Sequence, residues 1–322
     1  MNNLKISVII PCYNVQDYLN DCFDSVLSQT FKDFEIICVE DASTDNTSQI
    51  LKDYENKIHI IYNQNNKGLA ESRNIGLNSA RGEYIYFLDS DDTISPDCLE
   101  VLYNKISQDN SDMVMSEIEA YPQNHENQFC VQHAQHLNKW LEFSPFDKCQ
   151  ISEANVLDYY HKLHCCAVNK LYKKSFLIEN NIYFIHQKCF HEDNGFWFKI
   201  LSCNPTISGI GGTTYFYRVR NGSISDQMDI DEKAHQQNLS LSLKDALTFV
   251  KKRRNQVLSD FIYYEIYRQK RHRFISLVWL RYEKHLTVFW VTIFKMKFNA
   301  KKGKYTLKIF GIPVFKWRKK DV

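Results

Sequence analysis

The sequence lacks several patterns that mark common protein classes. No Cys-x-x-Cys pair occurs among its ten cysteines, which argues against a structural zinc site and against a small disulfide framework. No Gly-x-Gly-x-x-Gly follows a predicted strand, which argues against a dinucleotide-dependent dehydrogenase. The longest late apolar stretch, Leu286 to Phe294, is shorter than the ~20 residues of a membrane-spanning helix. The segment Ile6–Ile10 is too short and too weakly basic for a signal peptide, which predicts a cytoplasmic protein.

Negative charge is scarce toward the C-terminus. Residues 251–322 contain 20 Lys or Arg and 4 Asp or Glu, although the whole chain of 322 residues has a net charge of +2. An acidic body with a basic tail indicates that the tail meets an anionic surface. Aromatic residues are interleaved with these cations, which favours an anionic membrane over nucleic acid, for which no recognised motif is present. We predict peripheral association with the inner face of the cytoplasmic membrane through residues 231–322, and no nucleic-acid partner.

Strand and helix patterns alternate over residues 1–116. Strand-like runs rich in Ile, Val, Phe and Tyr occur at Ile6–Ile10, Phe34–Val39, Ile58–Tyr62, Tyr84–Leu88 and Asp112–Met115. This alternation predicts an α/β fold with a Rossmann-like, mostly parallel central sheet flanked by helices. In such sheets the ligand binds beyond the carboxyl ends of the strands. One crevice at this edge is therefore expected to collect three polar residues that each follow a strand, namely Asn14, Asp41 and Asp89.

Beyond residue 116 the patterns are weaker. Residues 117–150 are polar and predict a surface excursion, and Gly209-Ile210-Gly211-Gly212 predicts a turn. From about residue 231 the chain is expected to be a helical, basic extension that ends in a short β-like segment, Tyr305–Val314. The aromatic helices of this region leave a homodimer seam open as a further interpretation.

The motif Asp89-Ser90-Asp91-Asp92 follows the apolar run 83–87. Carboxylates at the end of a buried strand are costly to desolvate unless a cation or hydrogen bonds compensate them. Hard divalent ions prefer carboxylate oxygens, so a metal that holds a diphosphate is the simplest such cation. A structural alternative exists, because acids near a helix start at Ser95 are favoured by the helix macrodipole. Three acids in four positions exceed what one helix start needs.

Three further motifs each allow a structural and a functional interpretation. The acids in segment 39–45 either cap a helix or hydrogen-bond the imide of a pyrimidine base. Segment 66–74 is either a turn with an amphipathic helix or a place where a cation meets nucleotide phosphates. The cluster His191-Glu192-Asp193 precedes an aromatic stretch, and it either caps the following helix or provides a base that activates an incoming hydroxyl.

In this order and spacing, the motifs resemble those of family 2 glycosyltransferases with the type A nucleotide-diphospho-sugar transferase fold. The resemblance is strong over residues 5–120 and looser to about 226, where Asn169-Lys170-Leu171-Tyr172 and the segment 217–225 carry it. The family usually shows Asp-Asp-Gly where this chain has Glu40-Asp41-Ala42, so the second acid is retained.

The resemblance also implies roles for individual residues. Asp193 takes the position of the catalytic base, with Glu192 as its neighbour. Asp89 and Asp91 form the family's Asp-x-Asp motif, which binds Mn²⁺ or Mg²⁺. The implied nucleotide-sugar site consists of Pro11, Tyr13, Asn14, Asp41, Lys67, Arg73, Asp89 and Ser90.

The implied activity is an inverting, metal-dependent transfer of a hexose or N-acetylhexosamine from a UDP-sugar to a hydroxyl of a surface glycan or glycolipid, as in lipopolysaccharide, lipooligosaccharide or capsule biosynthesis. Residues 1–230 are expected to form the catalytic domain, with a nucleotide-binding half at 1–116 and an acceptor-side half at 117–230. A sugar-nucleotide pyrophosphorylase shares the sheet, but this chain lacks the Gly-rich N-terminal loop of that class. A non-catalytic glycan-binding relative is disfavoured because Asp91 and Asp193 are both present.

Overall fold

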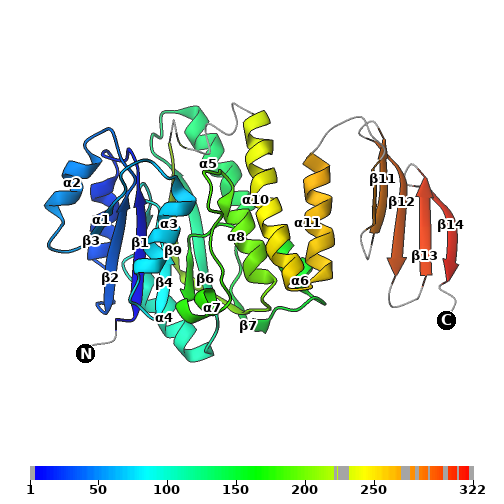
Figure 1. Cartoon of the computed structure of the whole chain (residues 1–322), viewed down its shortest axis with the longest axis horizontal. Helices are drawn as coiled ribbons and strands as arrows, with labels where there is room; N and C mark the ends of the chain where they lie inside the picture. Colours follow the sequence, from blue (N-terminus) through cyan, green and yellow to red (C-terminus); the bar gives the residue numbers. More distant parts are fainter. Residues whose placement is uncertain are drawn as a thin grey trace. The chain divides into compact units, whose positions relative to one another are not determined.

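The computed structural model describes residues 4–220, 223 and 232–269, together with strand segments at 276–279, 283–288, 291–299, 304–309 and 312–318 (Figure 1). The chain divides into two compact units, Met1–Ser242 and Leu243–Val322. Up to β9, the elements are β1 (Ile6–Cys12), α1 (Leu19–Leu27), β2 (Phe34–Glu40), α2 (Thr47–Asp53), β3 (His59–Tyr62), α3 (Leu69–Ser79), β4 (Tyr84–Phe87), β5 (Thr93–Ile94), α4 (Cys98–Asp109), β6 (Met113–Pro122), α5 (Gln128–Trp140), β7 (Phe146–Gln150), α6 (Val156–Lys162), β8 (Lys170–Lys173), α7 (Lys174–Glu179), α8 (Glu192–Leu201) and β9 (Thr206–Val219). They are followed by α10 (Glu232–Lys252), α11 (Gln256–Gln269), β10 (Ser276–Trp279), β11 (Glu283–Val288), β12 (Val291–Asn299), β13 (Lys304–Ile309) and β14 (Ile312–Arg318).

The described strands of the first unit form one central sheet in the order β3-β2-β1-β4-β8-β6-β9-β5, with β7 paired to β9. Strands β3, β2, β1 and β4 run parallel, and Figure 1 shows β1 and β4 side by side with helices along the sheet. All seven residues of β1 are buried, which is why its sequence is a continuous apolar run instead of an alternating one. The predicted α/β fold is confirmed, and the five strand-like runs up to residue 116 coincide with β1, β2, β3, β4 and the start of β6.

Helix α3 lies unusually close to β1, because it presents a glycine to the strand. A Cβ atom on Gly76 would lie 2.3 Å from the Cγ2 atom of Ile9, so any larger residue would require the Ile9 side chain or the helix to shift. The same helix carries Arg73, which is 1% exposed. This close approach brings the Arg73 side chain against the carboxyl edge of the sheet.

The surface excursion predicted for residues 117–150 is wrong. Strand β6 continues to Pro122 and pairs with β9, and the segment goes on to form helix α5 and strand β7. Within β6 the buried residues Ile118 and Ala120 alternate with more exposed glutamates, so this stretch is a half-buried strand. Segment 117–150 is polar on average because the solvent-facing positions of its elements outnumber the core positions. The average composition therefore did not reveal the strand and helix periods.

The turn predicted at Gly209–Gly212 is also wrong, because strand β9 runs through it. The pairing of β6 with β9 shifts register there: Met115 lies opposite Gly209, but Glu117 lies opposite Thr214. The extra residues of β9 form a bulge, and Gly212 adopts a φ of +83° that glycine accommodates without strain. The bulge re-aims the last part of β9, which carries Tyr215 and Arg218 to the carboxyl edge of the sheet.

The chain from about residue 231 onward is only partly helical. Helices α10 and α11 agree with the prediction, and the β-like end at Tyr305–Val314 falls on β13 and β14. The helical prediction is wrong for the segments between, because β10–β14 form an antiparallel sheet in sequential order. The sequence of β12, Val-Thr-Ile-Phe-Lys-Met-Lys-Phe-Asn, alternates apolar and polar residues at its C-terminal half, which is a strand period.

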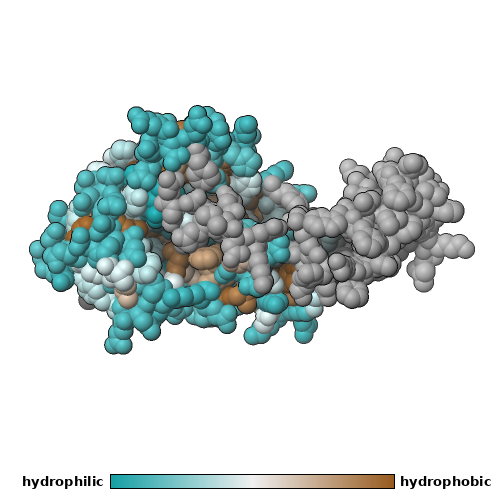
Figure 2. Space-filling view, turned by 90° about the horizontal axis from the view of Figure 1, so that it is seen from above, coloured by the Kyte–Doolittle hydropathy of each residue, from teal (hydrophilic) through white to brown (hydrophobic). Residues whose placement is uncertain are grey.

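No helix of the described residues is long and apolar enough to cross a membrane. Figure 2 shows a face of the molecule on which hydrophilic residues dominate the described surface, with hydrophobic residues gathered toward its middle. A large cluster of buried apolar residues forms the core around β1, β4, α1 and α4.

Candidate active site

The carboxyl ends of three neighbouring strands assemble the polar residues predicted from the sequence. Asn14 follows β1, Asp41 follows β2 and Asp89 follows β4, and these strands are adjacent in the order β2-β1-β4. The backbone N–H of Asp41 donates to the carbonyl of Cys12 at 2.9 Å, and the N–H of Leu88 donates to the carbonyl of Ile9 at 3.0 Å. The prediction that one edge collects all three residues is confirmed.

Asp41 is 3% exposed, and the chain itself uses its carboxylate. Its Oδ1 accepts hydrogen bonds from Asn63 Nδ2 and from the backbone N–H of Lys67, both at 2.8 Å, and its Oδ2 accepts one from the N–H of Gly68 at 2.7 Å. Gly68 has a φ of +91°. Asp41 thus shapes the turn that leads into α3, and its Oδ2 retains acceptor capacity because a carboxylate oxygen has two lone pairs.

The departure from Asp-Asp-Gly has a structural counterpart at Ala42. Ala42 has a φ of +59°, a left-handed conformation that costs a non-glycine residue roughly 1 kcal/mol. Glu40 offsets this strain, because its carboxylate accepts hydrogen bonds from the N–H groups of Ala42 at 3.2 Å and Ser43 at 2.7 Å. The longer glutamate side chain therefore holds the turn in which the family usually has glycine.

The other residues implied for the nucleotide-sugar site line the same edge with different exposure. Pro11 is buried within β1, Ser90 is 5% exposed, and Asn14 and the side chain of Lys67 are exposed. Tyr13 is 45% exposed, so part of this aromatic side chain is accessible to a ligand. Asn14 Oδ1 accepts a hydrogen bond from the N–H of Thr44 at 2.8 Å, which joins the loops after β1 and β2.

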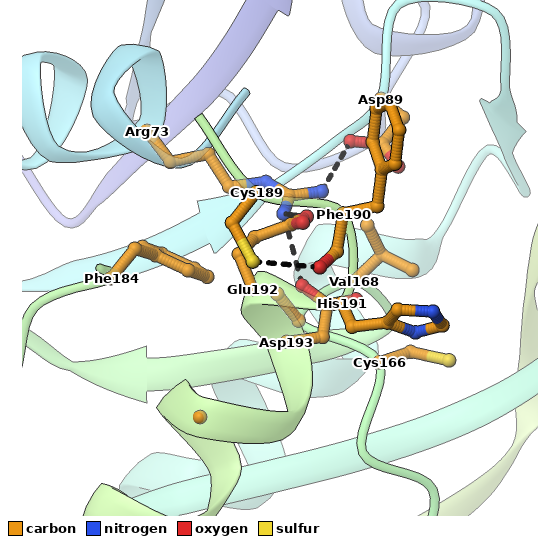
Figure 3. A network of polar contacts seen from close by, with 12 residues as sticks. Arg73, Asp89, Cys166, Val168, Phe184, Cys189, Phe190, His191, Glu192 and Asp193 are labelled. Carbon is orange, nitrogen blue, oxygen red and sulfur yellow. Dashed lines mark hydrogen bonds and ion pairs between the residues drawn. The ribbon is translucent and has the colours of Figure 1, made fainter. Parts of the chain in front are cut away.

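Arg73 is the centre of the candidate site (Figure 3). Its Nη2 donates to Asp89 Oδ1 at 2.7 Å, and its Nη1 donates to Glu192 Oε1 at 2.7 Å and to Asp193 Oδ1 at 3.0 Å. The guanidinium also lies 5.3 Å from the centre of the Phe184 ring. One buried cation therefore joins the acidic cluster after β4 to the acidic cluster at the start of α8, although sequence reasoning had placed Arg73 only near the nucleotide.

Glu192 and Asp193 are adjacent in sequence but differ in environment. The side chain of Glu192 is 7% exposed and that of Asp193 is 25% exposed, so only Asp193 reaches solvent appreciably. Burial and the neighbouring Asp193 raise the pKa of Glu192 to about 8, against the opposing effect of Arg73. Burial also raises the pKa of Asp193, which Arg73 and the backbone N–H of Ala167 counteract. Asp193 is therefore the better placed of the two to face an incoming hydroxyl as an ionised carboxylate.

Asp91 is held by two arginines from β9 and the residue that follows it. Arg220 Nε donates to Asp91 Oδ2 at 2.8 Å, and Arg218 Nε donates to the backbone carbonyl of Asp91 at 2.8 Å. Burial raises the pKa of Asp91, Arg220 lowers it and Asp89 raises it. Sequence reasoning missed both arginines, although both lie in the 217–225 motif.

Asp92 differs from Asp89 and Asp91 because both of its carboxylate oxygens bind β9. It is 1% exposed, and it accepts hydrogen bonds from Tyr215 Oη at 2.6 Å and from the backbone N–H of Arg218 at 2.7 Å. Burial, Asp91 and Asp89 raise its pKa well above the ordinary value. Asp92 fastens the acidic motif to β9, whereas the side chains of Asp89 and Asp91 stay 25% and 20% exposed.

Asp89 and Asp91 fit a divalent metal that arrives with a diphosphate. Among the described residues, no group of three or more His, Cys, Asp or Glu side chains is arranged to hold a metal. Mg²⁺ is commonly bound by one or two carboxylates with substrate phosphates completing its shell, and Mn²⁺ also prefers such oxygens. Two partly exposed carboxylates at a strand end match that ligand set.

Helix α10 supports the start of α8, which sequence reasoning missed because it assigned α10 to the C-terminal region. Ser242 Oγ donates to the carbonyl of His191 at 2.7 Å and accepts from the N–H of Gly195 at 2.9 Å. Asn238 Oδ1 accepts from the N–H of Phe190 at 3.1 Å, and the rings of His191 and His235 meet with their nitrogens 3.1 Å apart. The first half of α10 thus anchors the loop that presents Glu192 and Asp193.

The chain has a type A glycosyltransferase fold. Asn14, Asp41 and Asp89 lie at the carboxyl edge of its sheet, and Arg73 links Asp89 to Glu192 and Asp193. The chain belongs to glycosyl transferase family 2, whose family model matches residues 7–180.

The chain is similar to two curated bacterial glycosyltransferases. It is 46% identical over 113 residues to glycosyltransferase GlyA of Streptococcus pneumoniae, a match that covers 34% of this chain and 16% of GlyA. It is 28% identical over 222 residues to the poly(ribitol-phosphate) beta-N-acetylglucosaminyltransferase TarS of Staphylococcus aureus, covering 67% of this chain and 36% of TarS. The chain thus spans less than half the length of both relatives.

Solved structures share the fold. The structure of residues 1–349 of S. aureus TarS in complex with UDP-GlcNAc superimposes with a TM-score of 0.60 at 24% identity, covering 82% of this chain and 72% of that chain. The mannosyltransferase PcManGT of Pyrobaculum calidifontis, in complex with GDP-Man and Mn²⁺, superimposes with a TM-score of 0.53 at 14% identity, covering 82% of this chain and 73% of that chain.

Proposed function

We propose that this protein transfers a hexose or N-acetylhexosamine from a UDP-sugar to a hydroxyl of a bacterial surface glycan or glycolipid, with inversion at the anomeric carbon. The observation that carries the proposal is the Arg73 network, in which Asp89 and Asp193 contact the same guanidinium at 2.7 Å and 3.0 Å. Asp89, the proposed donor-binding carboxylate, and Asp193, the proposed base, are thus both hydrogen-bonded to Arg73. The TarS relative, named for N-acetylglucosamine transfer to a phosphate polymer, supports this donor and acceptor class.

The donor lies along the carboxyl edge in this proposal. Tyr13 stacks on the uracil ring, Asp41 Oδ2 accepts from the uracil imide, and Lys67 and the Asp89–Asp91 motif face the ribose and diphosphate. Asp89 and Asp91 would hold a Mn²⁺ or Mg²⁺ ion, which would neutralise negative charge on the UDP leaving group.

The acceptor approaches from the side of α8. Asp193 takes the proton of the acceptor hydroxyl while that oxygen forms a bond to the anomeric carbon, and the bond from this carbon to the β-phosphate oxygen breaks. The electron pair of the broken bond leaves with UDP. Arg73 keeps Asp193 oriented, and positioned base catalysis of this kind contributes ~10²–10⁴-fold.

A screen of UDP-sugars tests the proposal directly. UDP release is measured with Mn²⁺, with Mg²⁺ and with EDTA, in the presence and absence of glycolipid or polymer acceptors. We expect one UDP-sugar to give acceptor-dependent UDP release that EDTA abolishes and added metal restores. If the protein instead condenses a sugar-1-phosphate with a nucleoside triphosphate and releases diphosphate, it is a pyrophosphorylase. Glycan binding without turnover of any UDP-sugar would identify a non-catalytic relative.

Asp91→Asn tests the metal ligands. We expect at least a ~10-fold loss of transfer at limiting metal, partly recovered at high metal concentration, because an amide oxygen remains but the charge that attracts the ion is gone. Asp112→Asn is the matched control. Asp112 accepts hydrogen bonds from Thr206 at 2.8 Å, just before β6 at the opposite edge of the sheet. An unchanged metal requirement in Asp91→Asn would remove Asp91 from the metal site.

The basic C-terminal sheet is proposed to bring the enzyme to an anionic membrane surface. The register of the described strands pairs Lys295 with Lys308 and Lys304 with Arg318. The proposal rests on the charge of the segment, because residues 251–322 contain 20 Lys or Arg and 4 Asp or Glu. The aromatic residues 298, 310, 315 and 317, proposed as headgroup anchors, fall outside the residues whose side chains the structure describes.

Vesicle co-sedimentation measures this association. Each basic residue near an anionic surface contributes ~1 kcal/mol, which salt screens. We expect the full chain to bind anionic vesicles at low salt, to be released at high salt, and to ignore neutral vesicles. The full-length variant Lys304→Gln/Lys308→Gln/Arg318→Gln should bind less tightly than a Lys52→Gln/Lys57→Gln/Lys67→Gln control. Equal binding to both lipids would assign the tail to packing or self-association.

A further inference from the structure

A hydroxyl group from α10 lies within the first turn of α8. It belongs to Ser242, which is 0% exposed. Its Oγ donates to the carbonyl of His191 at 2.7 Å and accepts from the N–H of Gly195 at 2.9 Å. A regular helix start joins such a pair of backbone groups directly, as in α3, where the N–H of Ser72 donates to the carbonyl of Gly68 at 3.0 Å. In α8 the Ser242 hydroxyl bridges the corresponding pair.

Gly195 permits this close approach of α10 to α8. A Cβ atom on Gly195 would lie 2.6 Å from Ser242 Oγ and 2.9 Å from the Ser242 carbonyl oxygen. Glycine is a poor residue for a helix, because it loses more backbone freedom on folding than alanine does. The glycine in the first half of α8 therefore serves the contact with Ser242 and not the formation of the helix.

The residue before α8 is held by the same contact. His191 has a φ of +67°, a left-handed conformation that a non-glycine residue keeps only where its surroundings hold it. Besides the Ser242 hydroxyl, its carbonyl accepts from the N–H of Asn194 at 3.1 Å. One residue earlier, the N–H of Phe190 donates to Asn238 Oδ1 at 3.1 Å. Two side chains of α10 thus determine the backbone path into the turn.

The turn between His191 and Gly195 carries the two carboxyl groups of the candidate site. Figure 3 shows Glu192 and Asp193 beside Arg73, whose Nη1 donates to them at 2.7 Å and 3.0 Å. Without the bridge, the His191 carbonyl and the Gly195 N–H are free to approach each other and to close a regular turn. That closure moves Asp193 relative to Arg73, and a displacement of about 1 Å at a catalytic group can cost ~10²-fold in rate.

We propose that Ser242 is a positioning residue for the general base, Asp193. Its hydroxyl bridges the His191 carbonyl and the Gly195 N–H, and this bridge sets the direction in which the first turn of α8 presents the base. The inference rests on the proposed function for the role of Asp193. Ser242 does not touch the substrate and acts through the backbone of the turn. Arg73 then holds the base from α3, while α10 holds the turn that carries it.

Ser242→Ala tests the proposal, because it removes the bridge and places a good helix former in α10. We expect kcat for transfer to fall at least ~10-fold. The KM for the UDP-sugar should stay unchanged, since the proposed donor-binding residues Asp41 and Asp89 lie on other elements. Wild-type kcat in this variant, or a raised KM with kcat unchanged, would overturn the positioning role.

Ser202→Ala is the matched control at the other end of the same helix. Ser202 directly follows α8, is 5% exposed, and donates through Oγ to the carbonyl of Lys199 at 2.8 Å. Its loss should lower the melting temperature and leave kcat unchanged. An equal loss of kcat in Ser202→Ala and Ser242→Ala would mean that general destabilisation of α8 explains the effect, and would refute the inference.

Gly195→Ala approaches the same contact from the other side. Alanine favours a helix more than glycine does, but its Cβ atom displaces the Ser242 hydroxyl. We expect kcat to fall at least ~10-fold here as well, with the KM for the UDP-sugar unchanged. A folded Gly195→Ala variant with wild-type kcat would show that the bridge does not set the direction of the base.

A double-mutant cycle in urea unfolding separates this inference from the proposed function, because it needs no substrate. If Ser242 orients Asp193 toward Arg73, Ser242→Ala should destabilise the protein less in an Asp193→Ala background. We expect a deviation from additivity of at least ~3-fold in the unfolding equilibrium constant, whereas Ser202→Ala and Asp193→Ala should be additive within ~2-fold.

The cycle gives different answers for the two proposals. Additive effects of Ser242→Ala and Asp193→Ala would refute the positioning role even if the wild-type protein transfers sugar. Non-additive effects, with no transfer of any UDP-sugar by the wild-type protein, would refute the proposed function and leave the role of Ser242 in placing Asp193 standing.

Discussion

Asp193→Asn is expected to lower turnover at least ~10²-fold while UDP-sugar binding changes little. Asparagine keeps the shape of the side chain and an oxygen to accept from Arg73 Nη1, which lies 3.0 Å from Asp193 Oδ1. It cannot take a proton from an acceptor hydroxyl, so the loss falls on kcat. Calorimetry of donor binding and steady-state kinetics of transfer measure the two quantities separately.

Glu192→Gln is the control for Asp193→Asn. The side chain of Glu192 is 7% exposed and its pKa lies at about 8, because burial and Asp193 both raise it. It is therefore largely protonated at neutral pH, and a neutral amide replaces it with little change in charge. We expect a far smaller loss of kcat than in Asp193→Asn. The reverse order, with near-normal turnover in Asp193→Asn, would move the base to Glu192.

Arg73→Met is expected to destabilise the protein by about 3 kcal/mol at neutral pH, because it leaves the partly buried carboxylates of Asp89 and Asp193 without their cation and the Glu192 carboxyl without its donor. Asp89, Glu192 and Asp193 all lose a hydrogen bond of 2.7–3.0 Å from the guanidinium. Urea unfolding at constant slope measures this loss. The control is Arg81→Met. The Arg81 side chain is 71% exposed, and its ion pair with Glu35 is expected to be worth roughly 1 kcal/mol or less.

The pH dependence of the Arg73→Met effect has a definite sign. Arg73 lowers the pKa of both Glu192 and Asp193, so its removal raises these values further above those of the unfolded chain. Groups with a raised pKa in the folded state contribute stability at low pH and lose it as pH rises through the folded pKa. The difference between wild type and Arg73→Met should therefore widen as the pH rises through the folded-state pKa of Asp193 and, for Glu192, as it rises above about 8. A difference that stays constant as the pH rises would mean that lost packing against Phe184, and not unpaired charge, explains the effect.

The same linkage applies to wild type. Because the pKa of Glu192 is raised to about 8, its contribution to folding is full below the unfolded value near 4.5 and is lost as pH rises through 8. The protein is thus less stable at alkaline pH on account of this group. This loss of stability at alkaline pH results from the burial of the Glu192 carboxyl beside Asp193 at the start of α8.

The strands of the first 116 residues and the acidic motifs that follow them were determined by the sequence alone. A run such as Ile6–Cys12 is apolar at every position because both faces of a central parallel strand are buried, and this leaves a local signature. The carboxyl end of each strand must then lie at one edge, so the neighbourhood of Asn14, Asp41 and Asp89 follows from connectivity. The family-like motifs at Asp91 and Asp193 are likewise short and local.

In segments with a weak hydrophobic pattern, the sequence alone did not determine the secondary structure. The alternation in β6 is diluted by glutamates, and the glycines at 209–212 signal a turn just as well as the bulge that they form in β9. The C-terminal half of β12 alternates basic and apolar residues, but a composition count over the whole basic segment does not reveal this strand period. In each case local sequence allows two backbone conformations, and strand partners far along the chain select one of them.

The arrangement of the candidate site was decided only by the tertiary structure. Arg73 and Glu192 are separated by 119 residues, Arg220 and Asp91 by 129, and Ser242 and His191 by 51, so no local pattern links them. Each is a polar group that packing has removed from water, and it must find its partner wherever the fold brings one within hydrogen-bond distance. The sequence determined which groups carry charge at the strand ends. The packing of α3, α8 and α10 decided which carboxylates Arg73 meets and how Ser242 holds the start of α8.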